Sequence, residues 1–92
     1  MLYNLFASPR YEKDVAMAKK RGLDIDDLIS VVEKLQKGEK LERKHKDHPL
    51  HGNFEGTREC HIKPDWLLIY SKDDEIRLLS LIRTGTHSDL FK

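Results

Sequence analysis

Three kinds of side chain that can move protons around an anion gather in the second half of the sequence. His61 precedes a Lys-Pro-Asp break that contains Asp65, and Arg83 and His87 flank a Thr-Gly-Thr bend. Histidine both takes and gives protons near neutral pH, and arginine can hold two phosphate oxygens in a fork. This combination suits metal-free RNA cleavage. In that reaction a base activates the ribose 2′-hydroxyl, an acid protonates the departing 5′-oxygen and a cation stabilises the phosphate.

Strand periodicity decides whether these groups can meet. Because successive side chains of a strand point to opposite faces, residues two apart share a face. The last strand-like segment thereby divides into one set, Arg77, Leu79, Leu81 and Arg83, and a more apolar set, Ile76, Leu78, Ser80 and Ile82. If the polar faces of neighbouring strands coincide, His61 and Arg83 project into one open surface. Otherwise the histidines are surface imidazoles, and Arg83 pairs with Asp65 or Asp89.

The histidine and cysteine pattern does not favour a metal site. Three histidines recur at every third position over residues 45 to 51, but a proline and a glycine there argue against the helix that would align them. Cys60 and His61 are adjacent on a predicted strand, so their side chains point to opposite faces. A single cysteine also excludes an intramolecular disulfide and a cysteine-built zinc site. We expect no metal and no cofactor.

Length and composition describe one folded domain over residues 1 to 92. The chain is 38% hydrophobic and 36% charged, which is typical of globular proteins rather than disordered or membrane-embedded ones. Its longest apolar run, residues 66 to 70, is far below the ~18 residues that a membrane span requires. The N-terminal residues carry no signal-peptide pattern. We therefore expect a cytoplasmic protein without a membrane partner.

The middle of the chain carries a positive field. Its basic residues are Lys34, Lys37, Lys40, Arg43, Lys44 and Lys46. Only Glu39 and Glu42 oppose them. A field of this sign favours phosphate groups through counterion release and steering, so these residues are candidates for binding RNA. The alternative is a solvated helix end followed by a loop.

The elements that must position these groups alternate in a recognisable order. A short strand over residues 2 to 6 precedes a helix that begins at Ser8 and Pro9 and a second helix that begins at Asp24. A long polar loop follows over residues 38 to 56, and strands are expected over 57 to 63, 66 to 71 and 76 to 83. The order β-α-α-β-β-β predicts an α+β fold. In it a helical hairpin packs on one face of a twisted antiparallel sheet, and the other face remains wet.

Three motifs resemble those of the YafQ-like toxins of the RelE superfamily, at similar spacing over most of residues 45 to 91. They are His45-Lys46-Asp47-His48-Pro49-Leu50, the run from Arg58-Glu59-Cys60-His61-Ile62-Lys63-Pro64-Asp65-Trp66 to Tyr70, and Arg83-Thr84-Gly85-Thr86-His87-Ser88-Asp89-Leu90-Phe91. Residues 1 to 44 agree only in pattern. The resemblance implies a small RelE-like fold. It also implies a type II toxin that cuts messenger RNA in the ribosomal A site without a metal and is held inactive by a cognate antitoxin.

The resemblance also implies a set of functional residues. They are His48, His61, Asp65, Arg83, His87 and Phe91. Under this interpretation His87 is the acid, and either Asp65 or His61 accepts the 2′-hydroxyl proton while the other orients it. The remaining members would stabilise or contact the phosphate, except Phe91, which either anchors the tail or lies over an unstacked base. The basic residues from Lys34 to Lys46, with Arg10, Lys13 and Lys19 to Arg21, then become the surface expected to touch ribosomal RNA.

Two other classes of function remain open at this point. A non-catalytic module on the same fold could use the basic loop and Phe91 to hold RNA or a partner protein, with the histidines incidental. A toxin-like protein could also have kept antitoxin binding and lost cleavage. Altering His87 and Asp65 together separates an enzyme from a binder, because a binder would keep its cellular effect.

Overall fold

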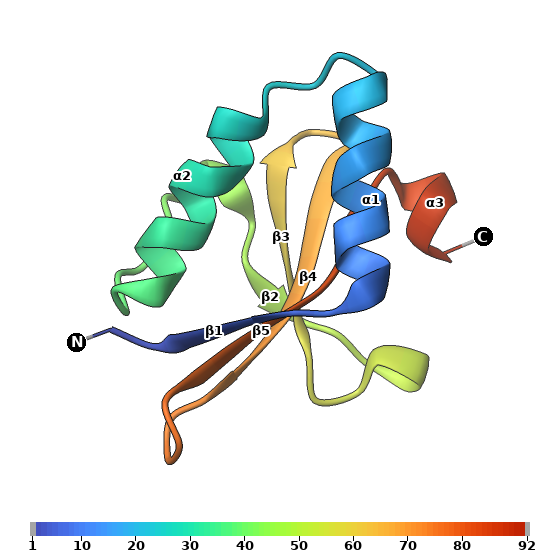
Figure 1. Cartoon of the computed structure of the whole chain (residues 1–92). Helices are drawn as coiled ribbons and strands as arrows, with labels where there is room; N and C mark the ends of the chain where they lie inside the picture. The colour runs from blue at the N-terminus through green and yellow to red at the C-terminus, as the bar shows by residue number, and fades with distance from the viewer. Residues whose placement is uncertain (1, 92) are drawn as a thin grey trace.

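Ten helices and strands follow one another along residues 2–91, the part of the chain that the computed structural model describes (Figure 1). In order they are β1 (Asn4–Ala7), α1 (Pro9–Lys20), α2 (Ile25–Gln36), the 3₁₀ helix η1 (Arg43–His45), β2 (His48–Pro49), the 3₁₀ helix η2 (Gly52–Phe54), β3 (Arg58–Lys63), β4 (Trp66–Asp73), β5 (Leu78–Gly85) and α3 (His87–Phe91). Residues 1 and 92, which the expected domain includes, lie outside this part. No helix within residues 2–91 has the length and apolar character needed to cross a bilayer.

The strands form one mixed sheet in the order β1-β5-β4-β3-β2. The α+β class is therefore confirmed, but the sheet is not wholly antiparallel as expected. The strand β1 pairs in parallel with β5, whereas β5, β4, β3 and β2 pair antiparallel. The helical hairpin carries the chain away after β1, so the first strand ends beside the last one and runs in the same direction.

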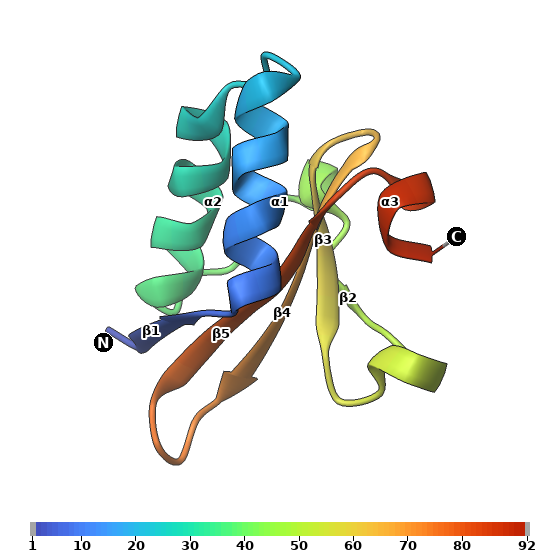
Figure 2. The ribbon, with the colours of Figure 1, turned by 45° about the vertical axis from the view of Figure 1, so that its right-hand side comes forward.

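The two long helices begin where the capping residues predict. Ser8 Oγ accepts a hydrogen bond from the Tyr11 backbone N–H at 3.0 Å, and Asp24 Oδ1 accepts one from the Asp26 N–H at 3.0 Å. Gly22 follows α1 in a left-handed conformation, with φ at +79°, which a glycine adopts without strain. The helices form one layer over the sheet, and α3 lies on the other side (Figure 2).

The main core lies between this helical layer and the sheet. Most of its buried members come from α2 and from alternate positions of the strands: Leu28, Val31, Val32, Leu35, Cys60, Ile62, Trp66, Leu68, Tyr70, Leu79 and Leu81. The prediction that Trp66, Leu68 and Tyr70 share a core face is confirmed. Burial raises the pKa of the Cys60 thiol to about 12, so this cysteine packs as a small apolar side chain.

The opposite face of the sheet is not wet at its centre, which corrects the prediction. Leu67 and Ile69 are fully buried there, and Leu90 of α3 covers them together with partly buried Leu50 and Phe54. The reason is that the segment before β3 folds back over this face instead of extending into solvent. The polar groups are therefore displaced to the rim of a second, smaller apolar cluster.

Residues 38 to 56 contain more structure than the expected long loop. The short strand β2 joins the edge of the sheet, where His48 pairs with Glu59 and Pro49 with Arg58. This strand has only two residues and no alternation of apolar and polar side chains, so the sequence pattern does not predict it. This pairing brings a histidine of the first motif onto the second motif.

A β-bulge breaks the simple alternation along β5. Ile69 pairs with Arg83 and Tyr70 with Leu81, so Ile82 is the extra residue. Leu81, like Leu79, consequently faces the helical layer and the main core rather than an open polar surface. The bulge separates the direction of Arg83 from that of the residues before it.

Candidate active site

The first catalytic candidate, His87, begins α3 and is bound to Asp65. His87 Nδ1 lies 2.9 Å from Asp65 Oδ1, and the His87 backbone N–H donates to the same oxygen at 3.1 Å. Since a carboxylate only accepts, the imidazole proton of this pair is on Nδ1, which directs Nε2 away from Asp65. Both side chains are more than half exposed, at 57% and 67%. The pair is therefore open to a substrate.

A capping box fixes the helix that carries His87. The Asp89 backbone N–H donates to Thr86 Oγ1 at 3.1 Å, while the Thr86 N–H donates to Asp89 Oδ2 at 3.0 Å. Arg21, directly after α1, holds the same carboxylate at 2.6 Å. These bonds keep the pKa of Asp89 well below its usual range, chiefly because of the Arg21 hydrogen bond. The start of α3 is thus tied to the helical layer.

His87 also changes the acidity of its partner. The side-chain hydrogen bond from His87, followed by its backbone N–H, lowers the pKa of Asp65. A carboxylate whose charged form is stabilised in this way is a weaker base. The geometry therefore favours Asp65 as the group that orients His87.

Two further histidines, His48 and His61, lie next to a buried carboxylate, Glu59. His61 Nε2 lies 3.3 Å and His48 Nε2 lies 3.6 Å from Glu59 Oε1, and the Glu59 side chain is only 5% exposed. His61 Nδ1 lies 3.2 Å from the Pro64 carbonyl oxygen, and His48 Nδ1 lies 2.7 Å from the Lys46 carbonyl oxygen. Each imidazole is hydrogen-bonded to a carbonyl oxygen through Nδ1 and has Nε2 next to the Glu59 carboxylate, so its orientation is fixed before any substrate arrives.

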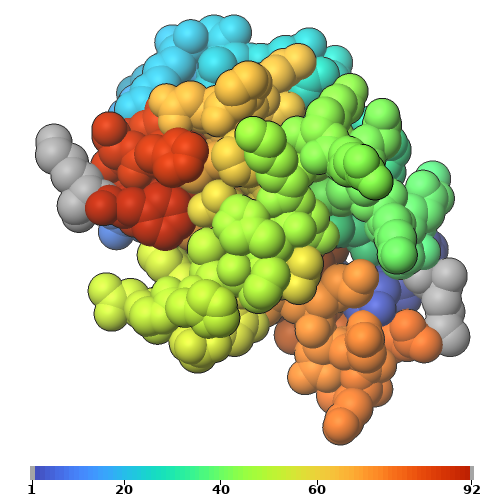
Figure 3. Space-filling view, turned by 180° about the vertical axis from the view of Figure 1, so that it is seen from behind, coloured from blue at the N-terminus to red at the C-terminus, as the bar shows by residue number. Residues whose placement is uncertain are grey.

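The His87–Asp65 pair lies beside His61. The rings of His61 and His87 are 5.9 Å apart between centroids, and the Phe91 ring lies 6.3 Å from His87. Phe54 packs edge-on against Phe91 at 5.7 Å, which leaves Phe91 44% exposed beside the imidazoles. Figure 3 shows the face on which α3 (red), the turn between β3 and β4 (gold) and the 43–48 segment (green) come together.

Arg83 does not join this cluster. Its guanidinium binds Asp14 of α1 at 2.7 Å and 3.1 Å, and no hydrogen bond or ion pair within residues 2–91 links it to His61 or His87. The expected alternatives, pairing with Asp65 or Asp89, are also wrong. Arg83 instead borders a separate hollow of about 290 Å³ between α1 and the end of β5.

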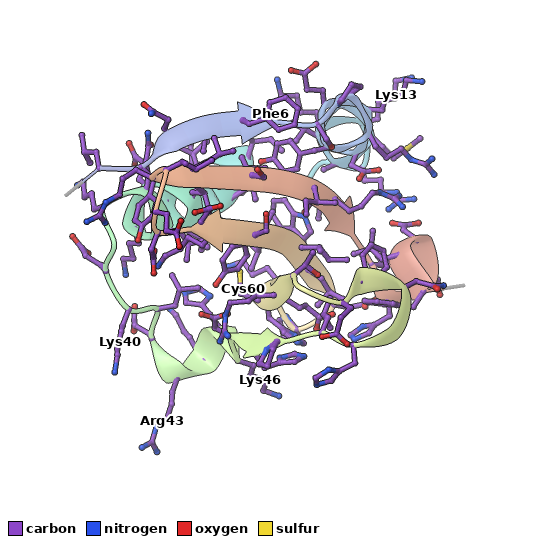
Figure 4. The ribbon with its side chains drawn as sticks, turned by 90° about the horizontal axis from the view of Figure 1, so that it is seen from below. Phe6, Lys13, Lys40, Arg43, Lys46 and Cys60 are labelled. Carbon is purple, nitrogen blue, oxygen red and sulfur yellow. The ribbon has the colours of Figure 1, made fainter. Side chains whose placement is uncertain are left out.

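The structure divides the predicted RNA-binding residues among several sites. Lys34, on α2, pairs with Glu42 at 3.4 Å, and Lys37 follows the same helix. Lys40 and Arg43 project outward from the body of the protein (Figure 4). Lys44 and Lys46, in contrast, border a hollow that also includes His61.

Sequence reasoning missed Glu59 and Phe54. Glu59 stands two positions before His61 on one strand, so the alternation of side chains already places both on one face. The signal was therefore present, but a charged residue in a strand is ordinarily assigned to solvent. Phe54 lies in a segment without periodicity and offers no comparable signal.

Comparisons with known proteins place this geometry in a family. Residues 3–92 match the family model described as the YafQ bacterial toxin of type II toxin-antitoxin systems. The mRNA interferase toxin YafQ of Escherichia coli K12 is 44% identical over 85 residues, which are 91% of this chain and 90% of that protein. The chain belongs to the YafQ toxin family. Its enzyme relatives thus cover nearly all of it.

Solved structures of relatives share the fold of this YafQ family member. The E. coli DinJ-YafQ toxin-antitoxin complex is similar over 100% of both chains, with 40% identity and a TM-score of 0.91. A metal-bound toxin from Helicobacter pylori covers 99% of this chain and 100% of that one, with 42% identity and a TM-score of 0.90. In this YafQ family member, no three histidine, cysteine or carboxylate side chains of residues 2–91 are grouped to hold a metal ion.

Proposed function

We propose that this YafQ family toxin is an endoribonuclease of the mRNA interferase class that cuts messages in the ribosomal A site. The observation that carries the proposal is the cluster of His61 with the exposed pair Asp65 and His87, with Phe91 beside it. The E. coli relatives are named mRNA interferase toxins, which supports the same reaction class. Two imidazoles beside an exposed aromatic ring suit a single-stranded RNA whose base stacks while its phosphate lies between the rings.

In the proposed reaction His61 is the base and His87 is the acid. His61 removes the 2′-hydroxyl proton, the 2′-oxygen attacks phosphorus, and the bond to the 5′-oxygen breaks as His87 protonates that oxygen. The products are a 2′,3′-cyclic phosphate and a 5′-hydroxyl end. Asp65, whose lowered pKa makes it the poorer base, orients His87.

The remaining residues of the proposed set act on the phosphate and the base. His48 contacts the phosphate or assists proton transfer, and Phe91 holds the unstacked base. Arg83 stabilises the developing phosphate charge, for which it must exchange Asp14 for the substrate phosphate. No metal or other cofactor takes part in this proposal.

The proposed partners are a cognate antitoxin, the ribosome and messenger RNA. A solved complex of the E. coli relative with DinJ supports an antitoxin that neutralises the toxin. Contact with RNA is proposed for the basic residues between positions 34 and 46, because such charges bind phosphates without reading sequence. These residues are Lys34, Lys37, Lys40, Arg43, Lys44 and Lys46.

Mapping the 5′ ends of ribosome-bound messages after induction of the toxin alone tests this proposal. We expect new ends at fixed positions of the reading frame for the wild type. His87→Gln should lower the cleavage rate about 10²- to 10⁴-fold, the usual contribution of a positioned acid, while folding and ribosome binding remain nearly intact.

Several outcomes would contradict the enzyme. Retained cleavage by His87→Gln would remove His87 from the mechanism. A cellular effect that persists in the His87→Gln, Asp65→Asn double variant would indicate a non-catalytic binder. Absence of both growth arrest and cut messages in the wild type would indicate a protein that has kept only the toxin fold.

A further inference from the structure

A second concave surface adjoins the proposed active site at His61 and is not lined by His87. It is a hollow of about 330 Å³ between η1 with its following residue and the turn that joins β3 to β4. Lys44 and Lys46 border it on one side and Lys63 on the other, and His61 is among its lining residues. The hollow and the proposed cleavage site therefore share one residue.

The lining of this hollow is positively charged and contains no carboxylate. Of its three lysines only Lys63 has an ion pair within residues 2–91, with Asp27 at 3.2 Å, and that pair is exposed to solvent. The carboxylates around the hollow have other partners: Glu42 lies 3.4 Å from Lys34, Asp47 is bound by Arg58 and Tyr70, and Glu59 faces His48 and His61. Exposed pairs of this kind contribute little, so the hollow attracts anions.

The walls of the hollow are fixed to the catalytic residues. The buried His45 ring contacts the His61 carbonyl oxygen through Nδ1 at 2.7 Å, which ties η1 to β3. Lys46 adopts a left-handed backbone conformation, with φ at +46°, which is unusual for a residue with a side chain. In this conformation its carbonyl oxygen meets His48 Nδ1. Unfavourable backbone conformations of this kind concentrate at functional sites.

We propose that this hollow binds a phosphate of the message adjacent to the one that is cut. The inference rests on the proposed function and extends it to a binding site for the substrate strand. With the scissile phosphate between His61 and His87, the strand continues past His61 into the hollow. Lys44, Lys46 and Lys63 then neutralise the next phosphate and fix the position of the strand.

A coupling experiment on programmed ribosomes tests the proposal and separates a message phosphate from a ribosomal one. Synthetic messages carry a neutral methylphosphonate at one linkage on either side of the cut. We expect Lys44→Ala to raise KM about tenfold with little change in kcat, since the variant removes one charge-assisted hydrogen bond to the strand. On the message that is neutral at the linkage facing the hollow, the same variant should raise KM by no more than about twofold. Lys44→Arg should restore cleavage.

Lys40→Ala is the matched control, because Lys40 belongs to the same basic segment but projects away from the hollow (Figure 4). Its effect should be the same on charged and neutral messages. The proposal would be overturned if Lys44→Ala left KM unchanged. It would also be overturned if the effects on KM of this variant and of the neutral linkage multiplied wherever that linkage was placed. Absence of cleavage by the wild type would overturn the proposed function itself, so the two failures are distinguishable.

Discussion

At the residue scale, two histidines of similar chemistry sit in contrasting environments. His87 has an exposed carboxylate partner, Asp65, whereas His61 has a buried one, Glu59. A buried carboxylate loses its hydration and depends on the hydrogen bonds that the protein supplies. The two imidazoles stabilise the Glu59 carboxylate, and the carboxylate in turn orients the imidazoles, so the three side chains hold one arrangement. We interpret Glu59 as the positioning residue of the proposed base.

The role of Glu59 leads to a prediction about the variant Glu59→Gln. The amide keeps the size of the side chain but removes the negative charge that faces both imidazoles. We expect kcat for RNA cleavage to fall about 10- to 100-fold, the equivalent of one hydrogen bond to a charged group, with KM nearly unchanged. The pH profile of kcat should also shift, because the charge beside His61 is gone.

Glu75→Gln provides the control, because Glu75 lies in the exposed turn between β4 and β5 and no hydrogen bond or ion pair within residues 2–91 links its carboxylate to the site histidines. Its pH profile should match that of the wild type. Glu59→Asp, which retains the charge, should recover part of the rate. A Glu59→Gln protein with a wild-type rate and profile would show that Glu59 only fills space.

The residues proposed for proton transfer could be chosen from the sequence, but their structural partners could be predicted only in part. His61, Asp65 and His87 stand in motifs whose chemistry is legible, and Asp65 with His87 indeed form a pair. The partner of Arg83 was not legible, because Asp14 lies 69 positions earlier on another element. Pairing over such a separation depends on how the helix docks, which local pattern does not encode.

At the element scale, α3 is the mount for His87 and Phe91. Its five residues are too few to form a stable helix alone, so packing and capping must hold it. Leu90 supplies the packing: it is buried against Leu67 and Ile69 on the second face of the sheet. The anchor Leu90 and the proposed catalytic residue His87 lie three positions apart on this single turn.

Shortening this anchor should therefore affect activity more than stability. We expect Leu90→Ala to cost about 2 kcal/mol of unfolding free energy and to lower cleavage at least tenfold well below the melting temperature. Leu28→Ala removes the same group from the main core, on the face opposite the site. It should lower the melting temperature at least as much and leave the activity at 20 to 25 °C nearly unchanged. Equal losses of activity in the two variants would refute this role of α3.

Charge at the start of α3 gives a prediction about pH and stability. The folded-state pKa of Asp89 lies below its unfolded value of 3.8, chiefly because of Arg21. Its contribution is therefore complete above about pH 4 and is lost as the pH falls through the lower folded value. Asp89→Asn should melt a few degrees below the wild type at pH 6, and this gap should narrow between pH 4 and pH 2. Glu33→Gln, at an exposed carboxylate without an ion pair in the described chain, should show no such convergence.

The predictability of the elements follows the range of their interactions. Ser8 and Asp24 cap their helices through hydrogen bonds within three residues, so the sequence located both starts correctly. The strand β2 and the parallel partner of β1 depend on contacts between distant segments, and neither was predicted. The bulge at Ile82 is likewise set by pairing with β4, and it separates Arg83 from the face that Leu79 and Leu81 share.

At the scale of the whole molecule, a net charge of +1 conceals separate charged regions. Lys40 and Arg43 extend from one side of the protein, and Lys13 lies at the opposite end (Figure 4). A flat ribosomal surface can meet only one of these sides at a time. The position of the proposed active site beside the 43–48 segment favours the side of Lys40 and Arg43.

This orientation predicts how ribosome binding depends on salt. Each phosphate that the protein neutralises releases counterions, so the logarithm of the association constant should fall linearly with that of the salt concentration. The Lys40→Ala, Arg43→Ala double variant should bind more weakly, with a slope that is smaller by about 0.7 to 0.9 for each phosphate that the variant leaves without its cation. Lys13→Ala should keep the wild-type slope, because the opposite side of the toxin faces away from the ribosome. If both variants reduced the slope equally, RNA would contact both sides of the toxin. If ribosome binding by the wild type did not depend on salt, these basic residues would not contact RNA.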